Sequence, residues 1–404
     1  MRIGRVILCG ILGTISMIAG CAAPKDGSTE NSVAVVQQVS AMPPDSVMPP
    51  KHTIALATGI SMAYLELGNP DGPPVIFLHG YTDTSRSFYP TVQALIERHP
   101  HLHLFVLDQR GHGASSMPPA SACAGAPEQC FRPADLAADV IAFMDAKHIR
   151  EASIVGHSMG SFVAQELGLS YPGRVERLIL VSTGPSLVDN VVLRDYILAE
   201  PVEGSWKAGF EAQGYAFPQG VYNLNPLDAN ADALKWITDS WVFELEANPH
   251  FLASIVPDTA HIKMGTWLGV ARALLATDNT ERLKHLSVPT LILWATQDGV
   301  FYEADEKALR ASLDVAVAGC KMEYYFKQYG KRPLSDTGSQ TDDIGHNIQW
   351  GAPEQVASDI ASYLQHGRPT KNWYYSAADN PQHIVTERGT APIIAGMKPC
   401  DCRK

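Results

Sequence analysis

Short apolar runs alternate with amphipathic stretches over most of this 404-residue chain. Apolar runs without polar alternation are typical of strands buried on both faces, and their alternation with helical patterns predicts a mostly parallel sheet with helices on both faces. The first two strands are expected to be antiparallel to each other. The predicted fold class is therefore α/β, and the eight expected strands are Thr53–Thr58, Ser61–Leu67, Val75–Leu78, Leu104–Leu107, Ile154–Val155, Arg177–Val181, Thr290–Trp294 and Met322–Phe326.

Helical patterns are found at Ala134–Lys147, Ser161–Ser170 and Glu354–Gln365. The interval from Val181 to Thr290 spans about a hundred residues, which is too long for one crossover helix. We therefore predict a helical cap over the mouth of the sheet, in which about half of the aromatic side chains pack helices together and the rest line a pocket. These aromatic residues are Trp206, Phe210, Tyr215, Phe217, Trp236, Trp241, Phe243 and Trp267.

The first twenty residues have the pattern of an export signal, with two arginines before an apolar stretch that is too short to span a bilayer comfortably. The stretch ends in Ile18-Ala19-Gly20-Cys21, which resembles the cleavage box of a bacterial lipoprotein signal. The resemblance implies a lipid anchor on Cys21 in the bacterial cell envelope, and the alanine that follows favours the outer membrane, facing the periplasm or the exterior. The alternative is an ordinary secretory signal cut near residue 22 or 23.

The organisation of the chain follows from these patterns. A stretch rich in Ser, Pro, Asp and Asn after the signal is typical of a flexible tether. We assign no function to the C-terminal tail. The predicted boundaries are a signal at 1–20, a tether at 21–51, the first part of the core at 52–185, a cap at 186–283, the second part of the core at 284–366 and a tail at 367–404.

Charge and cysteine content limit the possible partners. A formal net charge of -11 argues against sequence-independent nucleic-acid binding, which requires Lys and Arg to neutralise phosphates. Of seven cysteines, Cys123 and Cys130 flank a short loop and are the expected disulfide. Cys320 is left to pair with Cys400 or Cys402. We expect no cofactor and no metal, since a zinc site would need further His or Cys residues at ligand spacing.

The pentapeptide Gly156-His157-Ser158-Met159-Gly160 carries the main candidate chemistry. It follows an apolar strand and precedes a helical stretch, which is the context of a nucleophile elbow. A side chain at either glycine would collide with the neighbouring strand or helix. The pattern therefore predicts a serine on a strained turn.

Four motifs occur in a fixed order along the chain: His79-Gly80, the stretch Asp108–Ser115, the elbow at Ser158, and Gly345-His346. Together they resemble the α/β-hydrolase superfamily over residues from about 53 to 366. The resemblance implies an eight-stranded, mostly parallel sheet with an inserted helical cap.

The superfamily order is serine, acid, histidine, which implies Ser158 as nucleophile, Asp298 as acid and His346 as base. Alanine stands at 295, where the family usually has glycine, and Asp342 and Asp343 are alternative acids. The resemblance also implies that the main-chain N–H groups of Tyr81 and Met159 form an oxyanion hole.

Serine at the elbow argues against haloalkane dehalogenase and epoxide hydrolase chemistry, which use a carboxylate there. We expect cleavage of a small-molecule carboxylic ester or lactone with an apolar part, through an acyl-enzyme. Hydrolysis of an amide or peptide, hydrolysis of a carbon-carbon bond and perhydrolysis would use the same three residues. A non-catalytic lipoprotein scaffold is the other alternative.

Overall fold

The computed structural model describes residues 48–244, 246–319, 321–330, 344–376, 385–390 and 393–396. Among the helices in these ranges, none has both the length and the apolar character needed to cross a bilayer. Several predictions from the sequence lie outside these ranges. They concern the signal and its Cys21, residues 21–47 of the tether, Asp342, Asp343, Cys320, Cys400 and Cys402.

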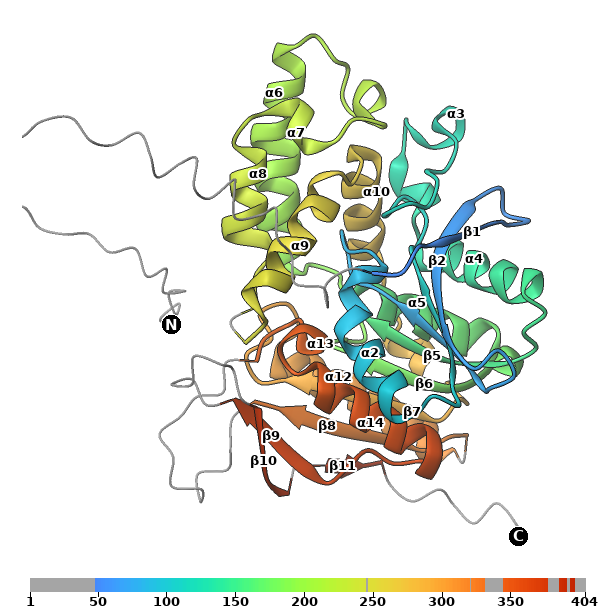
Figure 1. Cartoon of the computed structure of the whole chain (residues 1–404). Coiled ribbons are helices and arrows are strands. Elements are labelled where there is room, and N and C mark those ends of the chain that lie inside the picture. Colours follow the sequence, from blue (N-terminus) through green and yellow to red (C-terminus); the bar gives the residue numbers. More distant parts are fainter. Residues whose placement is uncertain are drawn as a thin grey trace, which may run out of the picture. The chain divides into compact units, whose positions relative to one another are not determined.

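The described residues form a nine-stranded sheet in the order β1-β2-β4-β3-β5-β6-β7-β8-β11 (Figure 1). Neighbouring strands from β4 to β8 are parallel, whereas β1, β2 and β11 pair in the antiparallel sense. The eight expected strands are all present. The strands are β1 His52–Ala55, β2 Ser61–Gly68, β3 Pro74–Leu78, β4 His103–Leu107, β5 Ala152–His157, β6 Val175–Val181, β7 Thr290–Ala295, β8 Tyr324–Tyr329 and β11 Ile393–Ala395.

The ninth strand is a difference from the prediction. The C-terminal region contributes β11, which pairs with β8 at the edge of the sheet. It also contributes a separate two-stranded ribbon of β9, Asn372–Ser376, and β10, Val385–Thr390. A strand of three residues is too short to show a clear alternating pattern in the sequence.

Both faces of the sheet are covered by helices, as the apolar strands predict. One core packs the α4, α5 and α12 side against strand residues such as Ile76 and Leu78. The other packs the α2 and α14 side against the alternate residues Val75 and Phe77. The covering helices are α2 Tyr89–Arg98, α4 Pro133–Ala146, α5 Met159–Ser170, α12 Glu303–Ala318 and α14 Pro353–His366.

The interval between β6 and β7 is helical, and Figure 1 shows α6 to α9 grouped together in it. Its first long helix is broken at Glu200 and Gly204, on either side of a proline that cannot donate a main-chain hydrogen bond. The elements are Val192–Trp206, α6 Lys207–Ala212, α7 Pro226–Ala229, α8 Ala233–Trp236, Ile237–Trp241, α9 Pro249–Ala260, α10 Met264–Leu275 and α11 Thr280–Leu283. This segment forms the cap.

Four tryptophans pack the cap together. Trp267 of α10 lies at its centre, with ring centroids 5.1 Å from Trp206, 6.4 Å from Trp236 and 6.4 Å from Trp241. The ring of Tyr81, from the loop after β3, lies 5.4 Å from that of Trp267. Edge-to-face pairs of this kind add to the free energy gained by apolar burial. The cluster therefore joins the cap to a loop at the carboxyl end of the sheet.

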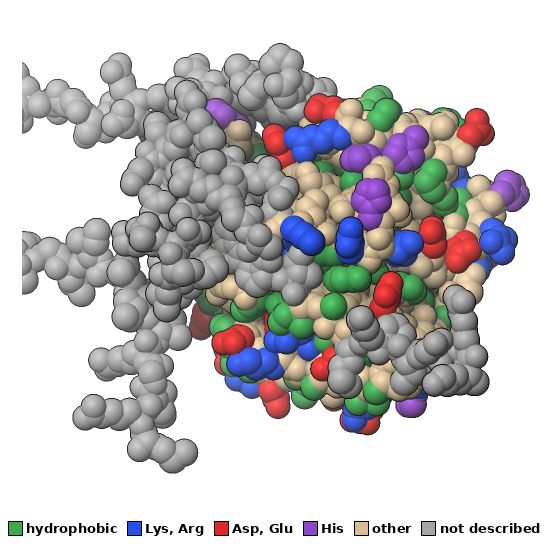
Figure 2. Space-filling model, turned by 90° about the horizontal axis from the view of Figure 1, so that it is seen from below, with side chains coloured by type: hydrophobic (Ala, Val, Ile, Leu, Met, Phe, Trp, Pro, Cys, Tyr) green, Lys and Arg blue, Asp and Glu red, His purple; other side chains and the backbone are tan. Residues whose placement is uncertain are grey.

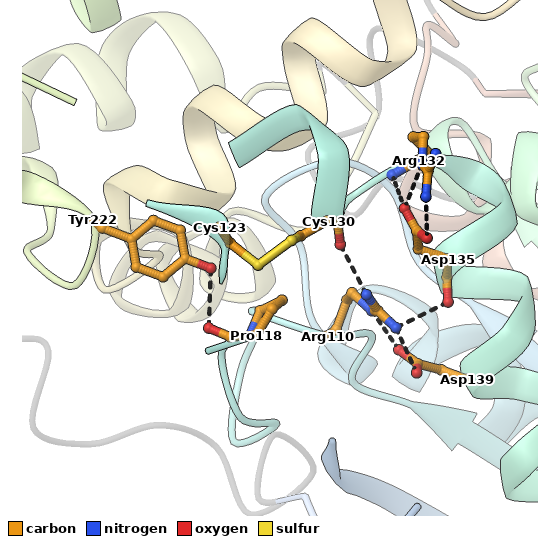
Figure 3. Close-up of a disulfide and its surroundings, with 8 residues drawn as sticks. All are labelled: Arg110, Pro118, Cys123, Cys130, Arg132, Asp135, Asp139 and Tyr222. Carbon is orange, nitrogen blue, oxygen red and sulfur yellow. Dashed lines mark hydrogen bonds and ion pairs between the residues drawn. A yellow bond between two sulfur atoms is a disulfide. The ribbon is translucent and has the colours of Figure 1, made fainter. Parts of the chain in front are cut away.

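A disulfide joins Cys123 to Cys130 (Figure 3), and the segment Pro127–Cys130 contacts α10. The carbonyl of Cys130 accepts a hydrogen bond from Arg110, whose guanidinium also forms two hydrogen bonds with the buried Asp139 carboxylate, at 2.6 and 2.7 Å. A Cβ at Gly269 of α10 would overlap the ring of Phe131, which follows this loop. The bridged loop therefore supports the cap helix that carries Trp267.

The surface of the described residues carries charges of both signs. On the face shown in Figure 2, Lys and Arg side chains lie among Asp and Glu side chains, with apolar and uncharged residues between them. Among the described residues, several ion pairs are largely exposed, such as Arg98 with Glu354. Exposed pairs contribute little to stability, so the buried cores described above carry the fold.

Candidate active site

The turn between β5 and α5 positions Ser158. Its main-chain angles are φ 50° and ψ -116°, a conformation that non-glycine residues rarely adopt. A Cβ at Gly156 would overlap the main chain of Gly160, and one at Gly160 would overlap the carbonyl of Leu78. Both glycines of the motif are therefore required by close approach of the main chain, and the serine lies on the strained turn that the sequence predicts.

His346 lies within hydrogen-bonding distance of both predicted partners. Its Nε2 is 2.9 Å from Ser158 Oγ, and its Nδ1 is 2.9 Å from Asp298 Oδ1. Because a carboxylate only accepts, we assign the ring proton to Nδ1, which leaves the lone pair of Nε2 facing the serine hydroxyl. A histidine placed in this way can take the proton of the serine as its oxygen attacks.

Asp298 lies in the loop after β7 and is buried. Its Oδ1 also accepts the main-chain N–H groups of Val300, at 2.8 Å, and Phe301, at 3.0 Å. These donors hold the carboxylate in place against the imidazole. Ala295, which stands in place of the usual family glycine, is the last residue of β7 and is fully buried. With alanine at this position, Asp298 still lies within hydrogen-bonding distance of the imidazole.

Of the two residues expected to form an oxyanion hole, one directly follows the serine and the other lies in the wall of the same cavity. Met159 is the first residue of α5, and the first N–H groups of a helix have no acceptor within it. Tyr81 lines the cavity beside Ser158, and its hydroxyl donates to the carbonyl of Trp267 at 2.6 Å. The loop before Tyr81 is braced by His79, whose Nδ1 donates to the Gly80 carbonyl and whose Nε2 accepts the N–H of Gln109.

A cavity of about 460 Å³ lies above Ser158 and His346. Its apolar wall combines aliphatic and aromatic side chains, but only Trp241 and Phe243 come from the eight cap aromatics named from the sequence. The expectation that about half of them line the pocket is therefore wrong: most pack cap helices together. The apolar lining consists of Tyr81, Leu187, Val192, Leu193, Tyr196, Trp241, Val242, Phe243, Leu274, Val300, Phe301 and Trp350.

Two buried carboxylates in the cavity wall were not predicted. Asp83 accepts a hydrogen bond from the Ser87 hydroxyl at 3.0 Å, and Glu244 accepts the N–H groups of Gly345 and Asn347. Burial raises the pKa of each carboxyl to about 7, although these donors act in the opposite direction. Asp83 follows the His79-Gly80 motif closely and could have been suspected, whereas Glu244 has no sequence signal.

Burial and charge act in opposite directions on His346. Burial alone would lower the pKa of its imidazole, but the carboxylates of Asp298, Glu244 and Asp83 outweigh burial and raise the pKa above its ordinary value. Burial lowers the pKa of neighbouring His157 well below its ordinary value, so this ring is neutral. No group of three or more His, Cys, Asp or Glu residues that could hold a metal occurs in the described part of the chain.

Comparisons with known proteins agree with this architecture. The family model described as "alpha/beta hydrolase fold" matches residues 73–320. The 3-oxoadipate enol-lactonase 2 of Acinetobacter baylyi is 24% identical over 253 residues, covering 63% of this chain and 82% of that protein. The non-heme chloroperoxidase of Streptomyces lividans is 27% identical over 270 residues, covering 65% and 87%.

A solved esterase structure from Exiguobacterium antarcticum has the same fold, with a TM-score of 0.57 at 17% identity. The match covers 78% of this chain and all of the esterase chain. The family model, the order of the strands and the turn that carries Ser158 lead to the same assignment. The chain belongs to the alpha/beta hydrolase fold family and is a hydrolase enzyme.

Proposed function

We propose that this enzyme cleaves a small-molecule carboxylic ester or lactone through a Ser158-His346-Asp298 triad and an acyl-enzyme. One observation carries the proposal: a continuous chain of hydrogen bonds runs from the Ser158 hydroxyl through the imidazole to a buried carboxylate, at the floor of a largely apolar cavity. The similarity to an enol-lactonase, a protein named for a lactone, supports the same reaction class.

The reaction begins when Ser158 Oγ attacks the carbonyl carbon and its proton passes to His346 Nε2. The carbonyl oxygen becomes an oxyanion, which the N–H groups of Tyr81 and Met159 would stabilise. His346 then protonates the leaving alkoxide, so the carbon-oxygen bond breaks and Ser158 carries the acyl group. In the second half, a water gives a proton to His346 as its oxygen attacks the acyl carbon. The bond between Ser158 Oγ and the acyl carbon then breaks, the carboxylic acid leaves, and His346 returns the proton to Ser158 Oγ.

The shape of the cavity limits the substrate. A volume of about 460 Å³ lies within the usual range for small-molecule pockets. Leu193, Trp241 and Leu274 from the cap and Val300 and Phe301 from the core make most of the wall apolar. Burial of an apolar acyl or alcohol part against these residues would supply the binding energy.

An active-site fluorophosphonate probe tests the proposal, because the probe reacts with an activated serine and needs no knowledge of the natural substrate. We expect the wild-type protein to be labelled and to hydrolyse a panel of simple esters and lactones. We expect the Ser158→Ala variant to lose both activities while remaining folded. A well-folded wild type that is neither labelled nor active would support a non-catalytic scaffold instead.

A further inference from the structure

Glu244 is a cap residue that contacts the loop carrying the base. We propose that it is a positioning residue for His346, holding the loop from the cap side and favouring the protonated imidazole that forms during the reaction. This proposal rests on the proposed function, since it assigns a role within the same site. Under this proposal the cap supplies a side chain that positions the base, in addition to covering the cavity.

The contact is made by both oxygens of one carboxylate. Glu244 Oε1 accepts the N–H of Gly345 at 2.9 Å, and Oε2 accepts the N–H of Asn347 at 3.0 Å. These two N–H groups flank His346 in the chain. A Cβ at Gly345 would lie 3.1 Å from Glu244 Oε2, so a larger residue there would crowd the carboxylate.

The core holds the same loop from its other side. The carbonyl of His346 accepts a hydrogen bond from the Ser182 hydroxyl at 2.7 Å, and His157 Nε2 donates to it at 3.1 Å. Ser182 directly follows β6 and His157 is the last residue of β5, so both lie at the carboxyl ends of core strands. The histidine is therefore fixed through its carbonyl by the core and through the flanking N–H groups by Glu244 of the cap.

The charges around His346 give Glu244 a second effect. Asp298 from the loop after β7, Asp83 from the loop after β3 and Glu244 from the cap face the imidazole, together with the neutral ring of His157. Asp298 is hydrogen-bonded to the imidazole, whereas Glu244 acts on the ring through space. Where the pH is above about 7 and Glu244 is ionised, its negative charge favours the charged imidazolium, so removing that charge lowers the pKa of His346.

The variant Glu244→Gln separates this role from general packing. The amide has nearly the same shape, but its NH₂ cannot accept the second N–H and its charge is gone. We expect kcat to fall about 10-fold to 100-fold with little change in KM, because small displacements of a catalytic group are costly. We also expect the acid limb of the kcat/KM profile to move to lower pH, because the pKa of His346 falls.

Two matched controls use the same region of the full-length protein. Ser182→Ala removes a hydrogen bond to His346 without removing a charge, so it should lower kcat and leave the acid limb in place. Glu246→Gln removes the carboxylate of a buried residue two positions along the same segment, and its activity and pH profile should equal those of the wild type. The variant Glu244→Asp keeps the charge on a shorter side chain, so it should lower kcat and retain the wild-type acid limb.

The pKa of His346 can also be measured by NMR titration of its ¹³C-labelled ring, with the signal assigned by its loss in His346→Asn. This readout needs no substrate, so it tests Glu244 even if the wild-type protein shows no ester turnover. An absence of turnover would contradict the proposed function alone.

A Glu244→Gln protein with kcat within twofold of the wild type and an unchanged His346 ring pKa would overturn the proposal. If Glu244→Gln does not fold, Glu244→Asp decides: unchanged kcat overturns the proposal, and reduced kcat with a wild-type ring pKa supports it.

Discussion

The sheet core and the cap contribute to one site by different physical means. In the core, the main chain sets the positions: Ser158 lies on a strained turn, and Asp298 and His346 lie in loops after neighbouring parallel strands. In the cap, side-chain packing sets them, through tryptophans such as Trp267 that contact one another from separate helices. This difference explains why the reactive residues can be recognised from local sequence motifs, whereas the shape of the cavity cannot.

Several hydrogen bonds join the two regions near the serine, and three of them involve residues described above. Tyr81 donates to the Trp267 carbonyl, the indole N–H of Trp241 donates to Thr82 at 2.7 Å, and Glu244 holds the histidine loop. Each contact joins a cap residue to a loop at the carboxyl ends of the strands. Changes in either region should therefore affect the other, to an extent that mutation can measure.

The largest expected effect is a loss of activity caused by a change in the core alone. Replacing Ser158 by alanine removes the nucleophile, so kcat/KM for a suitable ester should fall by about 10⁴-fold or more. The side chain contributes little packing, so we expect the free energy of unfolding to change by less than about 1 kcal/mol. Ester kinetics and urea denaturation of the same preparation measure both. Retained turnover would show that the reaction does not depend on the core motif.

A variant in the cap should affect the free energy of unfolding directly and the activity only indirectly. Trp267 is fully buried at the centre of the tryptophan cluster, so Trp267→Ala should lower the free energy of unfolding by about 3–5 kcal/mol. Its effect on activity should be indirect, through loss of the contact with Tyr81. Urea denaturation followed by circular dichroism checks the prediction. A loss below about 1 kcal/mol would mean that the cluster does not hold the cap in place.

Removing the disulfide tests how much the bridged loop stabilises the protein. A double change of Cys123 and Cys130 to serine removes a cross-link that closes a short loop, for which chain entropy predicts a loss of about 2–3 kcal/mol. Peptide mapping without reductant should find the bridge in the wild type. A reductant should destabilise the wild type and leave the double variant unchanged. Two free thiols in the isolated protein would contradict this prediction.

The smallest effect concerns pH. Protonated His346 cannot accept the serine proton, so kcat/KM should fall as the pH is lowered through its pKa. Because the neighbouring carboxylates outweigh burial and raise this pKa, the midpoint should lie above the ordinary value of 6.5. The pH profile of ester hydrolysis, recorded at constant ionic strength, gives the midpoint. A rate that is independent of pH on the acid side would argue against a histidine base.

Much of the core could be predicted because its signals are local. The glycines that the turn at Ser158 requires lie within two residues of the serine, so the motif can be recognised locally. Each buried strand can likewise be recognised from the run of apolar residues within it. The acid was harder to assign, since Ala295 departs from the family pattern and two other aspartates lie near His346 in the sequence. The structure places Asp298 against the imidazole, whereas Asp342 and Asp343 lie outside the described residues.

By itself, the sequence determined the fold class, eight strands of the main sheet and the nucleophile turn, because these depend on apolar periodicity and on main-chain geometry over a few residues. Only the tertiary structure decided which cap side chains reach the cavity and that Glu244 contacts a loop about a hundred positions away. Such contacts depend on how separate helices pack, and no local pattern of residues records that packing.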